Sequence, residues 1–319
     1  LLYLVLALII KVVGVNRAMR FLPPVVTGPI IICIGLSLAP SAVNNVQTNW
    51  ILAIVAFVII VIFNIWGKGM FKIIPILLGI AGSYMVALIL HFCGISQHDG
   101  KAIFDFTSVA SASWVNVPPF QLCKFDITAI LAMAPIAVAS MMEHIGDISA
   151  ISATVGENFV EDPGLHRTLI GDGLATAISA LFGGPANTTY GENTGVLELS
   201  KVHDPRVVRL AAIYAVVLSF IPKFAAIIST MPVAIVGGVS FILYGMIAAI
   251  GVRNVVENKV DFTKSRNLII AATILVCGLG FSSGLTFNIA GTSITLTGLA
   301  IAAIMGVFLN AVLPDNEEK

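Results

Sequence analysis

Charged residues are scarce in this chain. Only 11% of its 319 residues are Asp, Glu, Lys or Arg, whereas 58% are hydrophobic, and the mean hydropathy is +1.00. Soluble domains carry about 25% charged residues and have no means of burying so large an apolar fraction. The composition therefore excludes a soluble globular protein and predicts an all-α integral membrane protein built from spanning helices.

Basic runs and paired cysteines are also lacking. The 17 basic and 17 acidic residues give a net charge of zero, and no Lys/Arg run exceeds two residues, which excludes a surface for nucleic acid. Cys33 and Cys277 lie inside apolar segments, and Cys93 and Cys123 lack metal-ligand spacing, so we expect buried thiols, no metal and no cofactor. A His pair, a Cys pair and a Gly-x-Ser-x-Gly motif are absent too, which argues against a membrane enzyme.

The first apolar run is too short to cross a bilayer. Residues 1–10 precede Lys11, whereas a spanning helix needs about 20 apolar residues. The chain has no initiator Met, and it lacks the basic residues and the cleavage site of a signal peptide. We expect residues 1–10 to be the end of a span, with the N-terminal spans before it missing from this chain.

Further apolar segments are predicted to be helices, because an open sheet leaves backbone groups unpaired in lipid. Between residues 184 and 206 the chain is too polar and too short for a full crossing. There we predict a non-helical lead-in followed by a half-length helix over 192–202. The predicted spans are 22–40, 50–66, 72–93, 127–146, 168–184, 206–222, 232–251, 267–281 and 294–313.

The distribution of basic residues supports this count of crossings. If the half-helix counts as one crossing, Lys101, Lys124 and Lys223 fall on one side of the membrane and the other 14 of the 17 Lys and Arg residues on the opposite side. The positive-inside tendency makes the crowded side cytoplasmic. We therefore expect a cytoplasmic C-terminus. Without the half-helix the bias disappears, which is independent support for it.

Two spans begin with the same pattern. Pro23 to Gly28 and Pro232 to Gly237 both read Pro-x4-Gly, and the predicted topology gives these two spans opposite directions. Inverted repeats are the usual architecture of secondary transporters. The pattern predicts an inverted-repeat transporter fold.

Glu143 and Glu192 both stand between long apolar runs. A carboxylate at membrane depth is costly and marks a substrate or proton pathway by default. Asp147 lies four residues after Glu143, so a helix places both carboxylates on one face. The alternative is that they lie near the cytoplasmic end of the helix and reach water. His144 points away from that face, and we expect it to be a packing or interfacial residue rather than a ligand.

Glu192 follows Gly191 at the predicted start of the half-helix, where backbone N–H groups lack partners. A broken helix can offer such donors to a polar solute at the membrane midplane. Carboxylates beside free N–H groups suit a small planar molecule that carries both N–H donors and C=O acceptors. The alternative is that Glu192 only caps its own helix.

The polar residues around this turn have less specific roles. Side-chain hydrogen bonds of Asn187, Thr188, Thr189 and Asn193 are expected to hold the non-helical segment. Tyr190 and Tyr244 either line the cavity or pack as ordinary aromatic residues.

The segment from Asn187 to Lys201 resembles the signature of the nucleobase–ascorbate transporters. The family pattern is Gln/Glu/Pro-Asn-x-Gly-x4-Thr-Lys/Arg/Gly, and this chain matches it with Glu192, Asn193, Gly195, Ser200 and Lys201, where Ser replaces Thr. The resemblance extends along essentially the whole chain. Within the family, the chain resembles bacterial uracil permeases above all. It also includes the segments 143–146, 162–167 and 237–245.

This resemblance implies fourteen spans in two inverted sets of seven. It implies a core domain made of 1–20 and 126–228 and a gate domain made of 21–125 and 229–319. By the same resemblance, a homodimer is expected. Within the core, Glu143 and Glu192 would accept the nucleobase N–H groups and the Gly191 N–H would donate to a ring carbonyl, with Tyr190 and Tyr244 near the pocket.

The implied function is import of a nucleobase, above all uracil, by proton symport across the cell membrane. Burial and a neighbouring carboxylate both favour the protonated form of a carboxyl group, so Glu143 beside Asp147 is the expected proton site. Uracil permeases often carry His where this chain has Asp147, which is typical of purine-type relatives, so a purine or xanthine permease is the alternative. An anion transporter of similar fold is less favoured, because two carboxylates repel an anion.

Overall fold

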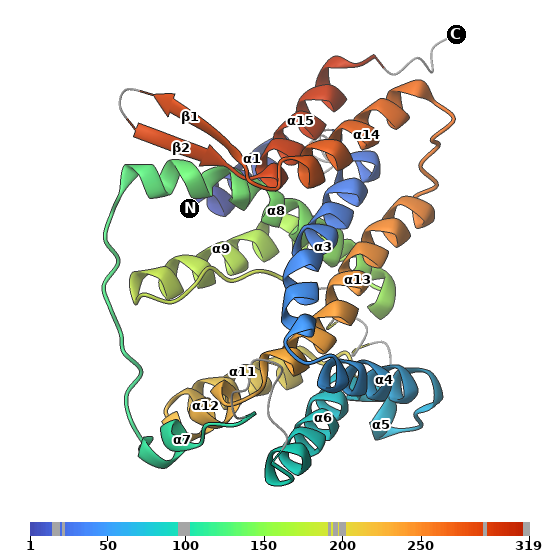
Figure 1. Cartoon of the computed structure of the whole chain (residues 1–319). Coiled ribbons are helices and arrows are strands. Elements are labelled where there is room, and N and C mark those ends of the chain that lie inside the picture. The colour runs from blue at the N-terminus through green and yellow to red at the C-terminus, as the bar shows by residue number, and fades with distance from the viewer. Residues whose placement is uncertain are drawn as a thin grey trace. The chain divides into compact units, whose positions relative to one another are not determined.

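The computed structural model is mainly helical (Figure 1). Each segment predicted as a span contains a helix, and one more, α1 (Leu2–Val13), precedes them. The structure describes residues 1–14, 20, 23–94, 103–190, 193, 197, 202–289 and 292–314. The span helices are α3 (Pro24–Gln47), α4 (Trp50–Trp66), α6 (Pro75–Phe92), α8 (Ile127–Val155), α9 (Leu165–Leu181), α11 (Pro205–Ser219), α13 (Val233–Glu257), α14 (Ser265–Gly280) and α15 (Gly298–Val312).

Helix length and composition indicate membrane spans. Within the described residues, α3, α6 and α13 are long and apolar enough to cross a membrane, and the bent pair α11 and α12 (Pro222–Ser229) is a fourth candidate with a 91° bend. Four apolar helices are shorter: α1, α4, α14 and α15. Other helical elements among the described residues are the short helices α5 (Met70–Ile73) and α7 (Thr107–Ser111) and a π-helical turn, Val160–Gly164.

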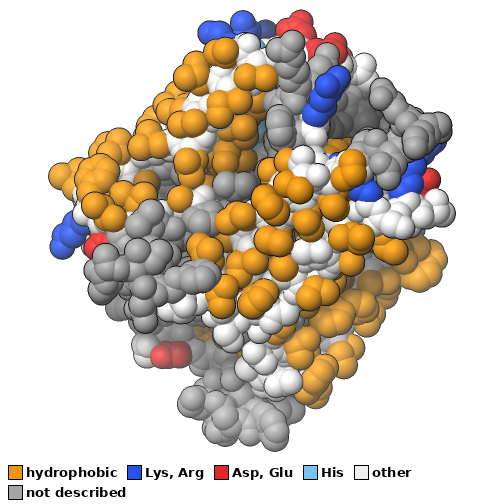
Figure 2. Space-filling model, turned by 90° about the horizontal axis from the view of Figure 1, so that it is seen from above, with side chains coloured by type: hydrophobic (Ala, Val, Ile, Leu, Met, Phe, Trp, Pro, Cys, Tyr) orange, Lys and Arg blue, Asp and Glu red, His pale blue; other side chains and the backbone are white. Residues whose placement is uncertain are grey.

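Hydrophobic side chains cover much of the face seen in Figure 2. Helix α4 shows the pattern: Leu52, Ala56 and Ile60 form its buried face, while Ile51 and Ile54 on other faces are more than half exposed. A helix that is apolar on all sides and still exposed belongs in lipid rather than water. The exposed apolar side chains thus agree with the composition in assigning the chain to a membrane.

The described residues form two compact units. Unit 1 comprises Leu1–Ser37, Phe120–Thr194 and Gly245–Lys319, and unit 2 comprises Leu38–Pro119 and Gly195–Tyr244. The core of unit 1 includes fully buried residues of α1, α3, α8, α9 and α14, among them Ile10, Ile30, Ile145, Leu169 and Ile274. The core of unit 2 is built from Leu52, Ile60, Ala87, Phe104 and Ile235. These units are defined by packing, so the predicted core and gate domains, which are defined by relative movement, stay a prediction.

Small residues allow the helices to approach closely. The Ser83 hydroxyl of α6 is fully buried and donates to the carbonyl oxygen of Leu52 at 2.7 Å. A Cβ atom at Gly237 would lie 2.6 Å from the backbone nitrogen of Val46, and one at Gly238 would collide with the carbonyl oxygen of Ala53. Apolar surface gives helices little reason to associate in lipid, so such contacts and interhelical hydrogen bonds hold them together.

A β-hairpin departs from the all-α expectation. Strands β1 (Leu285–Ile289) and β2 (Thr292–Leu296) pair antiparallel, with Leu285 opposite Leu296. The predicted span 294–313 was therefore placed too early, since its first residues belong to β2 and α15 begins at Gly298. Apolar and polar residues alternate along β1, which favours a strand. The Thr297 hydroxyl caps α15 by accepting from the Ala300 N–H.

Arg266 joins the start of α14 to the end of α15, at the end of this helix pair that was predicted to be cytoplasmic. Arg266 donates to the carbonyl oxygen of Asn310 at 2.8 Å, to its side-chain oxygen at 2.9 Å and to the carbonyl oxygen of Leu313 at 3.1 Å. The Asn310 amide in turn donates to the carbonyl oxygen of Arg20 at 2.9 Å. A cation that binds the last carbonyls of a helix stabilises its negative end. The cluster thereby fixes the chain just before α3.

We predict that Gly238→Ala destabilises the protein whereas Gly245→Ala in the same helix does not. The new methyl group at 238 meets backbone atoms of Ala53, while open space surrounds Gly245. Overpacking costs about 1–3 kcal/mol, and Ala otherwise favours a helix over Gly by up to about 1 kcal/mol. Thermal unfolding of the purified variants in detergent measures both effects, and equal melting temperatures would contradict the close contact.

Arg266→Lys is expected to lower stability by about 1–3 kcal/mol, because an ammonium group cannot form the forked hydrogen bonds of a guanidinium. Arg209→Lys is the matched control, since Arg209 is exposed. Thermal unfolding at several denaturant concentrations measures the stability of both variants and of the wild type. A destabilisation by Arg209→Lys as large as that by Arg266→Lys would show that the cluster has no special role.

Candidate functional site

Helix α8 carries the predicted acidic residues in its interior. The Asp126 carboxylate caps its first turn by accepting from the Ala129 N–H at 3.0 Å, and Gly156 ends the helix in the left-handed conformation. The helix extends nine residues beyond the predicted end at 146. Asp147 consequently lies two turns inside the helix, is only 5% exposed, and does not reach water as the alternative interpretation required.

The chain after α9 is extended, as predicted. Gly183, which has a φ of +82°, turns it away from α9, and Pro185 has no N–H to continue a helix. The hydroxyl of Ser179 then donates to the carbonyl oxygen of Pro185 at 2.9 Å, and the Thr176 hydroxyl lies 3.3 Å from both the N–H and the carbonyl oxygen of Asn187. Residues 184–190 therefore run back along α9, with α9 hydroxyl groups serving their backbone.

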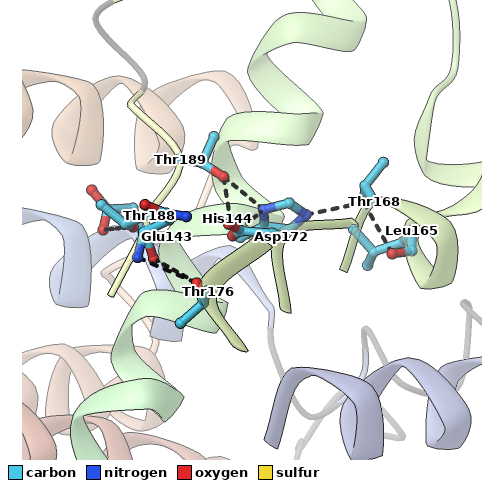
Figure 3. Close-up of polar contacts among 9 residues, drawn as sticks. Glu143, His144, Leu165, Thr168, Asp172, Thr176, Thr188 and Thr189 are labelled. Atoms are coloured by element: carbon cyan, nitrogen blue, oxygen red, sulfur yellow. Dashed lines mark hydrogen bonds and ion pairs between the residues drawn. The ribbon is translucent and has the colours of Figure 1, made fainter. Parts of the chain in front are cut away.

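His144 joins this extended segment to α8 and α9 (Figure 3). Its Nδ1 lies 2.7 Å from the Thr189 hydroxyl oxygen and 3.3 Å from a carboxylate oxygen of Asp172, and its Nε2 lies 3.0 Å from the Thr168 hydroxyl oxygen. The edge of the ring faces Tyr3 of α1, with ring centroids 6.1 Å apart. His144 is 3% exposed, so protein groups rather than bulk water must satisfy its nitrogens.

Glu143 is half-buried and meets the same segment. The Thr188 hydroxyl donates to its carboxylate over 3.5 Å, which is at the long limit for a hydrogen bond (Figure 3). Thr189 makes a contact of the same length with Asp172. Successive threonines thus face two different carboxylates, one on α8 and one on α9.

The other predicted site residues have varied positions. Tyr190 is exposed at the end of the extended segment, Tyr244 is half-buried in unit 2, and Asn193 is helical. Their contacts with a substrate stay predictions. Asn187 is bound through its backbone rather than through its side chain. The predictions for Gly191, Glu192, Gly195, Ser200 and Lys201 fall outside the described residues.

Asp172 was missed in the sequence although the signal was present. It stands between glycines in the predicted span 168–184, so the rule that singled out Glu143 applies to it equally. His144 packs against Tyr3, which is one of the two roles that the sequence predicted for it, and it also has three polar neighbours. Spacing along the chain did not reveal these neighbours.

An apolar groove of about 340 Å³ lies elsewhere in unit 1. Ile32, Val255, Phe262 and Leu275 are among its lining residues, and its wall has no polar surface. Such a groove suits hydrocarbon rather than a polar solute. As for metals, no group of three or more His, Cys, Asp or Glu residues in the described ranges could hold one.

Comparison with known proteins decides the family. A model of the Permease family matches residues 1–287. The chain belongs to this family. The permease is 40% identical to the uracil permease of Bacillus caldolyticus, over 98% of this chain and 73% of that protein. It is 39% identical to the uracil permease of Bacillus subtilis, over 100% of this chain and 74% of that protein. A putative pyrimidine permease of Escherichia coli is 37% identical to it, over 98% of this chain and 69% of that protein.

These relatives confirm the resemblance predicted from the signature. The permease is a multi-pass membrane transporter rather than an enzyme. In this transporter, the polar contacts of residues 184–190 involve Glu143 of α8 and, through His144 and Thr189, Asp172 of α9.

We predict that Thr176→Val releases the extended segment. Valine has the shape of threonine but no hydroxyl, so both backbone contacts with Asn187 are lost, and amide exchange at 186–190 is expected to accelerate about five- to tenfold. Thr176→Ser, which keeps the hydroxyl, should exchange at the wild-type rate. Hydrogen–deuterium exchange of the purified permease measures this, and unchanged exchange in Thr176→Val would refute the role of the hydroxyl.

Proposed function

We propose that this permease imports a nucleobase, uracil first of all, by proton symport. The observation that carries the proposal is the half-buried Glu143 carboxylate facing the extended segment that leads into the signature motif. A carboxylate beside irregular backbone can bind a solute with N–H donors and C=O acceptors without water. The names of the bacterial relatives add the substrate class.

The proposed substrate contacts follow the family resemblance. Glu143 and Glu192 accept the ring N–H groups, the Gly191 N–H donates to a carbonyl oxygen, and Tyr190 and Tyr244 line the pocket. A neutral, planar uracil needs both kinds of partner, because every unpaired polar group costs free energy once it is removed from water. The signature residues Asn187, Asn193, Gly195, Ser200 and Lys201 shape the surrounding turn.

Glu143 and Asp147 together carry the coupled proton in this proposal. They are one helical turn apart on α8, and Asp147 is buried. Two carboxylates in such a place are more stable when they share a proton. Uptake of the proton with the solute and its release inside would then couple import to the proton gradient.

Alternating access is proposed to occur between the core (1–20 and 126–228) and the gate (21–125 and 229–319). Support for inverted repeats comes from the Pro-x4-Gly glycines: a Cβ at Gly28 of α3 would collide with Val255 of α13, and one at Gly237 of α13 would collide with the end of α3. Such reciprocal contacts are expected of two inverted copies. A cytoplasmic C-terminus, a location in the cell membrane and a homodimer complete the proposal.

A purine or xanthine substrate is the second candidate, because Asp147 resembles the purine-type relatives at that position and is buried beside Glu143. An anion substrate is disfavoured. Glu143, Asp147 and Asp172 give this region three acidic residues, and His144 as its basic neighbour compensates for at most one of them.

We predict that Glu143→Gln and Glu192→Gln each lower proton-driven uracil uptake at least about tenfold, since a hydrogen bond to a charged group is worth about 1.5–3 kcal/mol. The intact natural protein in liposomes with an imposed pH gradient gives the measurement. Glu257→Gln is the matched control, because Glu257 is exposed and pairs with Arg253.

Competition with unlabelled xanthine and with inorganic anions separates the substrate classes in the same assay. Xanthine that competes more strongly than uracil would favour the purine alternative, and competition by anions alone would exclude a nucleobase. Wild-type uptake by both glutamine variants would overturn the assignment of the two glutamates.

A further inference from the structure

The hydrogen-bond partners of the buried His144 ring show which of its nitrogens carries a hydrogen. Its Nε2 lies 3.0 Å from the Thr168 hydroxyl oxygen, and that hydroxyl donates to the carbonyl oxygen of Leu165 at 3.0 Å. A hydroxyl has one proton, so Thr168 must accept from His144 if both contacts are hydrogen bonds. Nε2 therefore carries a hydrogen.

The second nitrogen faces an acid. Nδ1 of His144 lies 3.3 Å from Asp172 Oδ2 and 2.7 Å from Thr189 Oγ1 (Figure 3). A bare Nδ1 would direct its lone pair at an ionised carboxylate, which is repulsive at this distance. The contact becomes attractive when one proton lies between them, on Nδ1 or on Asp172. The Thr189 hydroxyl can then donate to whichever of the two is still an acceptor.

The contacts of the His144 ring with described residues come from Tyr3, Thr168, Asp172 and Thr189, none of which carries a positive charge. The titratable groups on the elements that pack against it are Tyr3 and Lys11 of α1, His166, Arg167 and Asp172 of α9, and Glu143 and Asp147 of α8 itself. Of these, Tyr3 and Asp172 contact the ring.

We propose that His144 is a positioning residue that holds residues 184–190 in place through Thr189, and that this hold requires one proton shared between His144 and Asp172. Thr188 precedes Thr189, so the same hold sets Thr188 against the Glu143 carboxylate. The shared proton is additional to the one that the proposed symport moves through Glu143 and Asp147. Only the consequence for transport rests on the proposed function; the structural consequence does not.

The decisive variant is His144→Gln in the intact natural protein. The glutamine amide reaches the position of Nε2 and can donate to Thr168, but it has no group in place of Nδ1. We expect amide exchange of residues 184–190 to be about tenfold faster than in the wild type. His91→Gln is the matched control, because His91 lies among aromatic rings at the end of α6 and should leave this segment unchanged.

Asp172→Asn tests the proton itself. An asparagine amide can donate to Nδ1 without any shared proton, so the segment should stay protected. Faster exchange of this segment in Asp172→Asn than in the wild type would contradict the shared proton. Melting temperatures and monodisperse elution check that each variant is folded.

Uracil uptake adds the functional readout. His144→Gln is expected to raise KM about tenfold with a smaller change in maximal rate, because it loosens a group that touches the site rather than removing one. Segment exchange equal to the wild type at every pH in His144→Gln would overturn the proposal. If exchange is faster in His144→Gln but the wild type binds no nucleobase, the proposed function fails and the positioning role stands.

Discussion

Backbone groups inside a membrane protein must find their hydrogen-bond partners within the protein, and this constraint governs residues 184–190. The segment has no helical ladder, so the hydroxyl groups of Ser179 and Thr176 take over that task along α9. At its far end, Thr189 reaches His144 on α8. The extended segment is thus placed by two helices at once, and its position determines what faces Glu143.

The helices that carry this segment are placed by close packing. A Cβ atom at Gly173 would lie 2.6 Å from Cβ of Tyr3, which brings α1 and α9 together, and the Tyr3 ring then faces the His144 ring. In lipid, where apolar contact alone gives little drive for association, such backbone approaches decide the arrangement. The same physical rule explains Gly28, Gly237 and Gly238 in the contacts of α3, α4 and α13.

Three acidic residues lie in the interior of two neighbouring helices. Glu143, Asp147 and Asp172 are acidic residues of α8 and α9, and His144 is their basic neighbour. The ion pair between Arg253 and Glu257, by contrast, is exposed, and an exposed ion pair contributes little to stability. A carboxylate inside a spanning helix is by default a candidate for a substrate or proton pathway, which is the basis of the proposal for Glu143.

The sequence by itself determined the membrane class, the helical segments and the interruption at Gly183, Gly184 and Pro185. Each of these depends on neighbouring residues, on their hydropathy or on their backbone preferences. The intramembrane Glu143 was recognisable for the same reason. The hairpin at 285–296 was not predicted, because its pairing joins two short segments that read as a span boundary.

Tertiary structure alone decided the partners of His144. Thr189 lies 45 residues away along the chain and Thr168 lies 24 residues away, so no periodicity relates them to the histidine. It also decided that Asp147 is buried, because α8 continues beyond the end of its apolar run and other helices pack around it. Local sequence sets which conformations a segment prefers, whereas hydrogen bonds and burial between distant segments exist only once the helices have packed.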